Sequence, residues 1–411
     1  MYKRQLSPDD AELARSLYGV TEKGNFEGRT ILHLAQPLED YAEEKQLEID
    51  ELRARLDRIN KQLLEVRNKR VPPLRDDKVV TAWNGMMITA FAEAAGLLDS
   101  ERYRQAAIDA GEFLWRQNRR GEGRLWRVHL DGRSSIAATQ EDYAYLSEAL
   151  IALYDLTGDR RWLQRAEELT QALLARFRDT ENGGFFMNEA EAGLTAMGRP
   201  KDDGSDSAIP SGSSVGLQAL QKLWRRTGNL QYRQQARELI GRFTPSLEQL
   251  PHNFGYMLTA ILDQTSGELG ALGYAAQGGI RLQAGLIQLD AAAKTLSIDL
   301  QLPDGWHINS DQPGHPDLIG TQVKLDKRSG WTLADIRYPP GESKKLGFQR
   351  EPINLYTGQV TIQARLDTPT GLTDDLSVPV QVRLQACNDQ VCLPPEEITS
   401  VSYTHLTLPT T

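Results

Sequence analysis

The sequence predicts a multidomain α + β protein in which an α/α toroid of paired helices is followed by an all-β sandwich. Two observations indicate the toroid: an apolar helical hairpin at residues 139–177, and the recurrence of its pattern on both sides. A third observation indicates the sandwich. After Gly267 the spacing of the apolar residues changes from the period of a helix to the alternation of a strand.

The hairpin consists of two helices with different surfaces. The first, which runs from Asp142 to about Leu156, is apolar on nearly every side and should therefore be buried all round. The second places its apolar residues on one stripe and its charged residues elsewhere, so that one face lies in the core and the other in water. The stripe consists of Trp162, Ala166, Leu169, Leu173 and Phe177. Gly158 and Asp159 between the helices are a C-cap followed by an N-cap.

A capping residue, followed by an aromatic residue at plus three and an alanine at plus seven, occurs three times. The three capping residues are Ser100, Asp159 and Asn229. The apolar helices that precede them are predicted at 82–98, 142–157 and 215–227. The units lie about 60 to 70 residues apart, which is longer than common helical repeats, and the excess lies in the connections 118–139 and 178–211. Repeated helix pairs stack because no single pair covers its own apolar face, and this spacing favours a toroid over an open solenoid.

Residues 6–75 are predicted to be a helical lead-in. A charged helix is expected from about Leu38 to Lys69, where Pro72 and Pro73 end it. Its apolar residues form a loose stripe, so we expect the helix to lie on a surface.

Short alternating runs separated by turn signals predict the sandwich at 279–400. The runs are 286–289, 296–300, 322–325, 359–364 and 378–384. Residues 268–278 are interpreted as a linker between the sandwich and the toroid segment at 76–267.

Composition excludes several classes of protein. A net charge of −9 and a pI near 5.4 argue against a nucleic-acid or anionic-membrane partner. The sequence contains no run of about 18 apolar residues, so no membrane span is predicted. Two cysteines exclude a disulfide-dense scaffold, and without a second ligand pair they do not predict a zinc site. We expect neither a cofactor nor a metal.

Both ends of the chain resemble a translated sequencing adapter, at residues 1–5 and 401–411. We therefore expect a gene fragment that is natural from about residue 6 to residue 400, and the ends are excluded from fold reasoning. His405 is not counted as a ligand or a base, and the lack of a visible signal peptide carries no information.

Carboxylates and aromatic residues are expected to converge on one rim of the toroid, because the long connections all lie at one end of the hairpins. A concave mouth with a few polar groups is the default hypothesis for a binding site. The polar candidates are Asp76, Asp77, Lys78, Asn84, Glu141, Asp142, Lys201, Asp202, Asp203, Asp206, Ser211 and Ser213. The aromatic candidates for stacking on sugar rings are Trp83, Tyr143, Phe185 and Phe186.

Glycoside hydrolysis requires two acids that flank the scissile bond. Asp142 is the first candidate for a catalytic acid or base, with Asp76, Asp77 or Asp202 as its partner. The alternative is that Glu141 and Asp142 only stabilise a helix N-terminus through the helix dipole. Epimerisation next to a carbonyl would require a histidine base, but His129 and His252 lie in no motif, so hydrolysis is the less disfavoured of the two reactions.

Cys387 and Cys392 are the sharper signal in the sequence. Four residues separate them, which keeps the sulfurs close enough for a disulfide across a turn. Such a disulfide is either a structural staple or a labile, exchangeable pair. A small closed loop removes little entropy from the unfolded chain, so a staple here would gain little, and exchange is the favoured reading.

Two resemblances extend these interpretations. The segments "YGVTEKGNFEG", "DDKVVTAWNGMMITAFAEA", "QEDYAYLSEALIALY" and "RPKDDGSDSAIPSGSSV" resemble the spermatogenesis-associated protein 20 family over about residues 6–265. This resemblance implies an N-terminal thioredoxin-like domain with a Cys-x-x-Cys motif, followed by a toroid similar to six-hairpin glycosidases and N-acylglucosamine 2-epimerases. The thioredoxin-like domain and the first hairpins are absent here, so the expected fold is an incomplete (α/α)6 toroid.

The segments "LPDGWHINSDQPGHPDLIGTQVKL" and "ACNDQVCLPP" resemble the immunoglobulin-like N-terminal domain of DsbD thiol:disulfide interchange proteins, over about residues 280–400. The resemblance implies that Cys387 and Cys392 pass electrons between a thioredoxin-like or transmembrane partner and periplasmic thiols. The best-known members have one more residue between the cysteines, which leaves the geometry of this loop open.

Three functions follow as hypotheses. The first is thiol–disulfide exchange in the bacterial cell envelope, with a thioredoxin-like partner and a toroid that binds a carbohydrate or a protein substrate. The second is a carbohydrate-active enzyme with an accessory redox module. The third is an interaction scaffold without catalysis. If the DsbD-like interpretation fails, the expected location is the cytoplasm.

Overall fold

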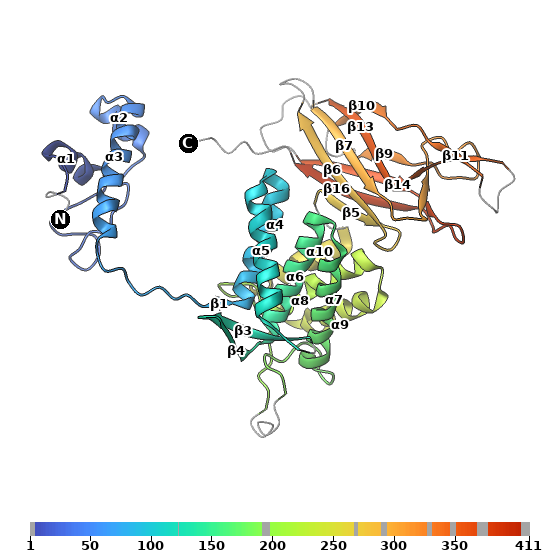
Figure 1. The fold of residues 1–411 in the computed structure, drawn as a ribbon, viewed down its shortest axis with the longest axis horizontal. Helices are drawn as coiled ribbons and strands as arrows, with labels where there is room; N and C mark the ends of the chain where they lie inside the picture. Colours follow the sequence, from blue (N-terminus) through green and yellow to red (C-terminus); the bar gives the residue numbers. More distant parts are fainter. Residues whose placement is uncertain are drawn as a thin grey trace. The chain divides into compact units, whose positions relative to one another are not determined.

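The computed structural model of the 411-residue chain is shown in Figure 1. It describes residues 5–121, 123–190, 198–266, 270–288, 294–326, 331–345, 351–367 and 377–403. The chain divides into two compact units, residues 1–77 and 78–411, and each is described by itself. Residues 1–4 and 404–411, which make up most of the two predicted adapter segments, lie outside the described residues.

The first unit contains three helices around a small core. They are α1 (Pro8–Leu17), α2 (Leu38–Lys45) and α3 (Ile49–Asn68). Leu17, Tyr41 and Ile59 are buried between them. The prediction of one continuous helix over 38–69 is wrong, because Gln46 adopts a left-handed conformation (φ 55°) that ends α2. Its backbone N–H bonds back to the last turn of α2, and a new helix then begins at Ile49.

The second unit begins with an array of paired helices. These are α4 (Thr81–Leu98), α5 (Glu101–Gln117), α6 (Gln140–Thr157), α7 (Arg160–Phe177), α8 (Gly212–Thr227), α9 (Leu230–Gln249) and α10 (Gly255–Ser266). Helices α4, α6, α8 and α10 contact one another in that order, and α5, α7 and α9 pack on their outer side. As predicted, every residue of α6 from Asp142 to Tyr154 is buried.

The predicted caps position these helices. The side chains of Ser100, Asp159 and Asn229 accept hydrogen bonds from backbone N–H groups in the first turns of α5, α7 and α9, at 3.4, 3.0 and 3.0 Å. Gly158 and Gly228 end α6 and α8 in the left-handed conformation, with φ of 71° and 69°. The capping residues predicted between the paired helices are therefore confirmed at each of these turns.

The connection 118–139 contains a small antiparallel sheet that the sequence analysis did not predict. Its strands are β1 (Val79–Val80), β2 (Arg119–Arg120), β3 (Arg124–Leu130) and β4 (Arg133–Ala137). Strand β3 contacts α4 and α6, and Leu125 and Val128 in it are buried. The sheet therefore covers the N-terminal ends of two inner helices.

The rest of the second unit is an antiparallel β-sandwich. One sheet has the order β10 (Thr332–Arg337), β13 (Gln359–Asp367), β7 (Lys294–Gln301), β6 (Ile280–Gln288), β5 (Leu272–Ala275). A second has the order β16 (Glu396–Tyr403), β14 (Ser377–Leu384), β9 (Gln322–Leu325). A third has the order β11 (Glu342–Lys344), β12 (Ile353–Thr357), β8 (His307–Asn309), β15 (Ala386–Cys387). Residues of the first two sheets, such as Ile298, Ile362 and Val380, share one buried core.

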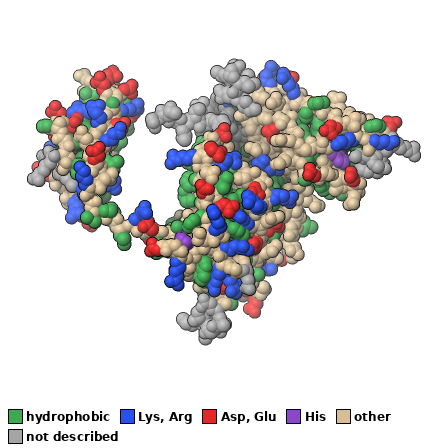
Figure 2. Space-filling view, viewed as in Figure 1, with side chains coloured by type: hydrophobic (Ala, Val, Ile, Leu, Met, Phe, Trp, Pro, Cys, Tyr) green, Lys and Arg blue, Asp and Glu red, His purple; other side chains and the backbone are tan. Residues whose placement is uncertain are grey.

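These observations confirm the predicted fold class, part of an α/α toroid followed by an immunoglobulin-like sandwich. Within the described residues, no helix is both long and apolar enough to cross a membrane. Figure 2 shows acidic and basic side chains interspersed over the viewed face of this unit.

The joint between the helical array and the sandwich is packed. Strand β5, which lies within the predicted linker 268–278, pairs with β6 in the sandwich. The hydroxyl of Tyr274 donates to Asp155 Oδ1 at 2.6 Å, and Arg226 binds the same carboxylate at 2.7 and 2.5 Å. A Cβ on Gly278 (φ 83°) would lie 2.0 Å from the carbonyl oxygen of Arg226, so only glycine fits there. Residues 272–275 of the predicted linker thus form an edge strand of the sandwich.

Residues 401–403, which the sequence analysis assigned to an adapter, continue strand β16. Val401 pairs with Pro379, and its backbone N–H donates to Gly270 at 2.8 Å. The origin of these residues stays a prediction.

Candidate functional site

Cys387 and Cys392 form a disulfide across a tight turn at the edge of the third sheet. The Cα atoms are 4.0 Å apart. Asn388 organises the turn: its side-chain oxygen accepts from the N–H groups of Gln390 and Val391, each at 2.9 Å. The Leu393 N–H closes the turn by donating to the Ala386 carbonyl at 2.8 Å. The bond expected from the spacing is thus formed inside a hydrogen-bonded hairpin.

The two cysteines differ in their access to solvent. Cys387 belongs to strand β15 and is 2% exposed, whereas Cys392 is an exposed residue on the returning arm of the turn. Disulfide exchange proceeds by attack of a thiolate on one sulfur and departure of the other. Because Cys392 is the more exposed of the two residues, an outside thiolate would reach its sulfur first, and the sulfur of Cys387 would then be the leaving group.

His307, which was not among the candidates from the sequence, lies directly opposite the buried Cys387 on the neighbouring strand. Strands β15 and β8 are antiparallel, with Cys387 opposite His307. His307 is 5% exposed, and its Nε2 has no hydrogen-bond partner among the described residues. Burial lowers the pKa of His307 below its ordinary value, while the nearby Asp389 opposes that change. The available signal was its place in "LPDGWHINS", one of the two segments that carry the DsbD resemblance.

In the helical array, Asp142 links two inner helices rather than facing a mouth. It is fully buried and accepts hydrogen bonds from the backbone N–H of Ala82 in α4 at 3.0 Å and of Thr139 at 2.9 Å. Arg127 completes its shell at 2.9 Å and also binds Glu141 at 2.7 Å. Burial raises the pKa of Asp142, and Arg127 and the backbone donors oppose that rise.

Asp202 and Asp206 make the same kind of contact at the neighbouring helices. Asp202 accepts from the Ser213 N–H at 2.7 Å, in the first turn of α8, and from the Gln140 side chain of α6 at 2.9 Å. Asp206 accepts from the N–H groups of Ser211 and Tyr256, at 2.9 and 2.8 Å, and the second of these belongs to α10. The acids do gather at the N-termini of the inner helices, where they accept hydrogen bonds from the first turns. For Glu141 and Asp142 the sequence analysis had raised a helix N-terminus as the alternative.

The other candidates of the rim do not form one constellation. The exposed fraction of Trp83 is 57%, the Asn84 side chain donates to the Val80 carbonyl at 2.9 Å, and Lys201 binds Asp179 at 2.5 Å. Lys78 is an exposed residue at the start of the second unit. Asp76 and Asp77 end the first unit and are therefore not placed relative to the others, although Asp77 pairs with Arg75.

The prediction that Tyr143 and Phe185 stack on a sugar is wrong. Tyr143 is fully buried, packs on Phe177 with ring centroids 5.1 Å apart, and accepts a hydrogen bond from the Leu125 N–H at 3.0 Å. Phe185 is 3% exposed. Strand β3 supplies the Leu125 donor and covers the tyrosine, which a pattern confined to the helix could not indicate.

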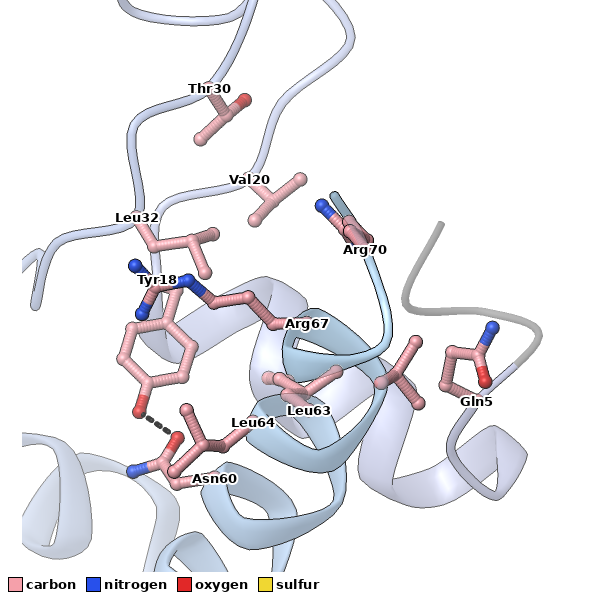
Figure 3. A pocket seen from close by; sticks show the side chains of 12 residues that line it. Gln5, Tyr18, Val20, Thr30, Leu32, Asn60, Leu63, Leu64, Arg67 and Arg70 are labelled. Carbon is pink, nitrogen blue, oxygen red and sulfur yellow. Dashed lines mark hydrogen bonds between the residues drawn. The ribbon is translucent and has the colours of Figure 1, made fainter. Parts of the chain in front are cut away.

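The first unit holds a cavity of about 570 Å³ beside α3 (Figure 3). Its wall is mainly apolar, and the Tyr18 hydroxyl donates to Asn60 Oδ1 at its edge, at 2.7 Å. Arg67 and Arg70 supply the charge. Among the described residues that line it there is no carboxylate, imidazole or thiol.

Comparison with known proteins confirms both predicted resemblances. Residues 282–402 match the family of the N-terminal domain of the thiol:disulfide interchange protein DsbD. Spermatogenesis-associated protein 20 from Homo sapiens is 29% identical over 272 residues, which cover 62% of this chain and 34% of that protein. The protein of the same name from Mus musculus is 29% identical over 259 residues, 58% of this chain and 33% of its own. The chain thus spans about a third of the curated relatives it matches.

Two kinds of solved structure align with part of this chain. The cellobiose 2-epimerase of Spirochaeta thermophila aligns with a TM-score of 0.38 and 20% identity, over 46% of this chain and 55% of that one. The N-terminal domain of DsbD from Neisseria meningitidis, in its reduced form, aligns with a TM-score of 0.21 and 15% identity, over 27% and 77% of the two chains.

Proposed function

We propose that this chain exchanges a disulfide with a partner dithiol through Cys387 and Cys392. The observation that carries the proposal is the unequal exposure of the pair, which presents Cys392 to a partner and keeps Cys387 inside the sandwich. The match of residues 282–402 to the DsbD N-terminal family supports the same conclusion.

The exchange balances as two successive displacements. A thiolate of the partner attacks the sulfur of Cys392 and forms a mixed disulfide, and the sulfur of Cys387 leaves with the electron pair and is protonated. The second thiol of the partner then loses its proton and attacks the partner's own sulfur in the mixed disulfide, which releases the thiolate of Cys392. The partner is oxidised by two electrons and the pair is reduced. The reverse sequence oxidises the pair.

A thioredoxin-like domain is the partner that the resemblance suggests, and the cell envelope is the location. A disulfide persists more readily outside the cytosol, on the periplasmic side of a bacterial membrane. Electron transfer in either direction is compatible with the chemistry of the pair.

An equilibrium redox titration of the full chain tests the proposal. The fraction of Cys392 that reacts with a thiol-alkylating reagent is measured in buffers of defined glutathione or dithiothreitol ratio, and a Cys387→Ser variant calibrates the free thiol. We expect a potential above about −300 mV, in the range of exchangeable disulfides. A potential below that value would place the bond among inert structural disulfides.

We propose that the helical array binds a substrate, either a carbohydrate or a protein, rather than catalysing a reaction. The exposed fractions of Trp83 and Met87, one turn apart on α4, are 57% and 50%, and Figure 2 shows hydrophobic side chains gathered over this helix. The alternative of a glycosidase requires two acids that reach the substrate, whereas Asp142 and Asp202 accept hydrogen bonds from helix N-termini.

Turnover of a panel of glycosides and free sugars distinguishes the two roles. We expect no turnover that depends on Asp142, and weaker binding of a ligand found by screening when Trp83→Ala is introduced. A rate that the folded Asp142→Asn variant abolishes would restore Asp142 as a catalyst and make the chain a carbohydrate-active enzyme.

A further inference from the structure

The geometry of the third sheet places His307 beside the sulfur that leaves during exchange. Residues directly opposite each other in an antiparallel pair carry their side chains on the same face, with Cβ atoms about 4.5–5.5 Å apart. His307 on β8 has Cys387 opposite it on β15 and Thr357 opposite it on β12. The imidazole therefore lies between a hydroxyl-bearing side chain and the buried half of the disulfide.

One nitrogen of the buried imidazole lacks the hydrogen bond that a structural histidine normally makes. Its Nε2 is shielded from solvent and has no partner among the described residues. Buried polar groups are satisfied in most proteins, so an exception calls for an explanation, and a role in chemistry is one of the recognised explanations. The buried acid Asp142 of the helical array, by contrast, accepts bonds from Ala82, Thr139 and Arg127.

The charges that face the imidazole come from the disulfide turn and from strand β11. Asp389 in the turn favours a protonated ring, and Lys344 on β11 disfavours it. Lys344 is itself held by Glu342 at 3.0 Å. Burial is the largest influence and lowers the pKa of His307, so the ring is neutral near pH 7 and can accept a proton.

We infer that His307 takes up and returns the proton of Cys387 during disulfide exchange. The inference rests on the proposed function. When the partner attacks Cys392, the sulfur of Cys387 leaves as a thiolate in a site where burial disfavours the charge, and His307, protonated from solvent beforehand, gives it that proton and returns to the neutral form. In the reverse direction the imidazole accepts the proton of the Cys387 thiol, and the thiolate attacks the mixed disulfide at Cys392.

The rate of reduction by dithiothreitol, measured as a function of pH, tests this role in the full chain. We compare the unaltered protein with His307→Gln and His307→Phe, and with His315→Gln as a matched control. His315 lies in the same domain, with 46% of its side chain exposed. We expect both His307 variants to be reduced about tenfold more slowly at pH 7, with a change in the shape of the pH profile, and the control to be unchanged.

A second measurement separates proton transfer from packing. In a Cys392→Ser background, the pH dependence of Cys387 alkylation gives the pKa of that thiol. We expect this pKa to rise when His307→Gln is added. An unchanged pKa, or a loss of rate that is the same at every pH, would show that His307 only fills space and would overturn the inference.

The two proposals fail in different ways. If dithiothreitol and a thioredoxin-type dithiol do not reduce the unaltered protein, the proposed function fails and the inference fails with it. If the unaltered protein is reduced and the His307→Gln variant follows the same profile, only the inference fails. The thermal transition of the sandwich is recorded for every variant, so that a folding defect in one His307 variant is recognised and the other is used.

Discussion

Three buried acids of the helical array and the buried imidazole of the third sheet differ in their hydrogen bonding. At the N-termini of the inner helices, Asp142, Asp202 and Asp206 each accept backbone hydrogen bonds from one helix and a further bond from the next segment or helix. In the third sheet, His307 is buried with an unused nitrogen beside a disulfide. The acids are thus accounted for by the helix N-termini they bind, whereas the Nε2 of His307 has no described partner that accounts for its burial.

The two regions also differ in which of their bonds can be broken without disturbing the fold. A carboxylate that holds two helices together cannot leave its donors without loosening the array. The pair Cys387–Cys392 closes only a short turn, so opening it disturbs little of the surrounding sheet. The helical array, whose buried acids connect its helices, and the third sheet, which carries the disulfide, are therefore distinct regions of one compact unit.

Removing Asp142 should have the largest effect on stability. The change Asp142→Ala leaves the N–H groups of Ala82 and Thr139 without their acceptor and Arg127 without one of its partners. We expect a loss of about 3 kcal/mol or more in the free energy of unfolding, measured by urea denaturation. Asp109→Ala, at an exposed position on α5, is the control and should change stability by less than about 0.5 kcal/mol.

The redox behaviour of the Asp142→Ala variant sharpens the comparison. While the sandwich is folded, the Cys387–Cys392 pair should keep the potential of the unaltered protein. A large shift in potential with little loss of stability would reverse the roles assigned to the two regions.

A smaller effect is expected at the joint between the regions. The change Tyr274→Phe removes the hydroxyl that donates to the carboxylate of Asp155 at 2.6 Å. A hydrogen bond to a charged group contributes about 1.5–3 kcal/mol, and the bonds from Arg226 to the same carboxylate stay in place. We expect a loss near the lower limit, and an unfolding transition that begins to separate into a helical step and a sandwich step.

Tyr154→Phe is the control for the joint. Its ring stacks on Tyr274 with centroids 6.2 Å apart, so the substitution preserves the stacking and changes a different hydroxyl. If the two phenylalanine variants destabilise the chain equally, the bond to Asp155 does not hold the joint.

The sequence alone was sufficient where structure depends on neighbouring residues. Caps at Ser100, Asp159 and Asn229 and the glycine ends of α6 and α8 follow from residues a few positions apart. The runs 296–300, 322–325, 359–364 and 378–384 likewise fall in β7, β9, β13 and β14, whereas short or edge strands such as β8, β11 and β15 were not predicted. The break at Gln46 was missed because a left-handed glutamine leaves no composition signal.

The spacing of apolar residues cannot predict contacts between residues that lie far apart in the sequence. Tyr143 looks like a rim residue because it lies in the first turn of α6, but strand β3 from the preceding connection and Phe177 of α7 cover it. The position of His307 opposite Cys387 becomes known only from the register of β8 against β15. The role of Asp142 was ambiguous for the same reason, since its donor Ala82 is 60 positions away.

The smallest predicted effect concerns acid sensitivity, and it separates the two regions by pH. Lys201 and the N–H groups of Glu181 and Asn182 hold the pKa of Asp179 well below its ordinary value. The folded chain therefore keeps this carboxylate charged where the unfolded chain protonates it, and the resulting stability is present above about pH 4 and lost as the pH falls further. Urea midpoints between pH 3 and pH 6 should show a shallower acid limb in Asp179→Asn than in Asp203→Asn.

The sandwich should respond at a higher pH. Because burial lowers the pKa of His307, the unfolded chain takes up that proton first, and stability declines as the pH falls through about 6.5, the ordinary pKa of histidine. His307→Gln should remove this decline and leave the acid limb of the helical array in place. If acidification instead weakens both regions over one pH range, the satisfied carboxylates and the unsatisfied imidazole do not differ as the comparison requires.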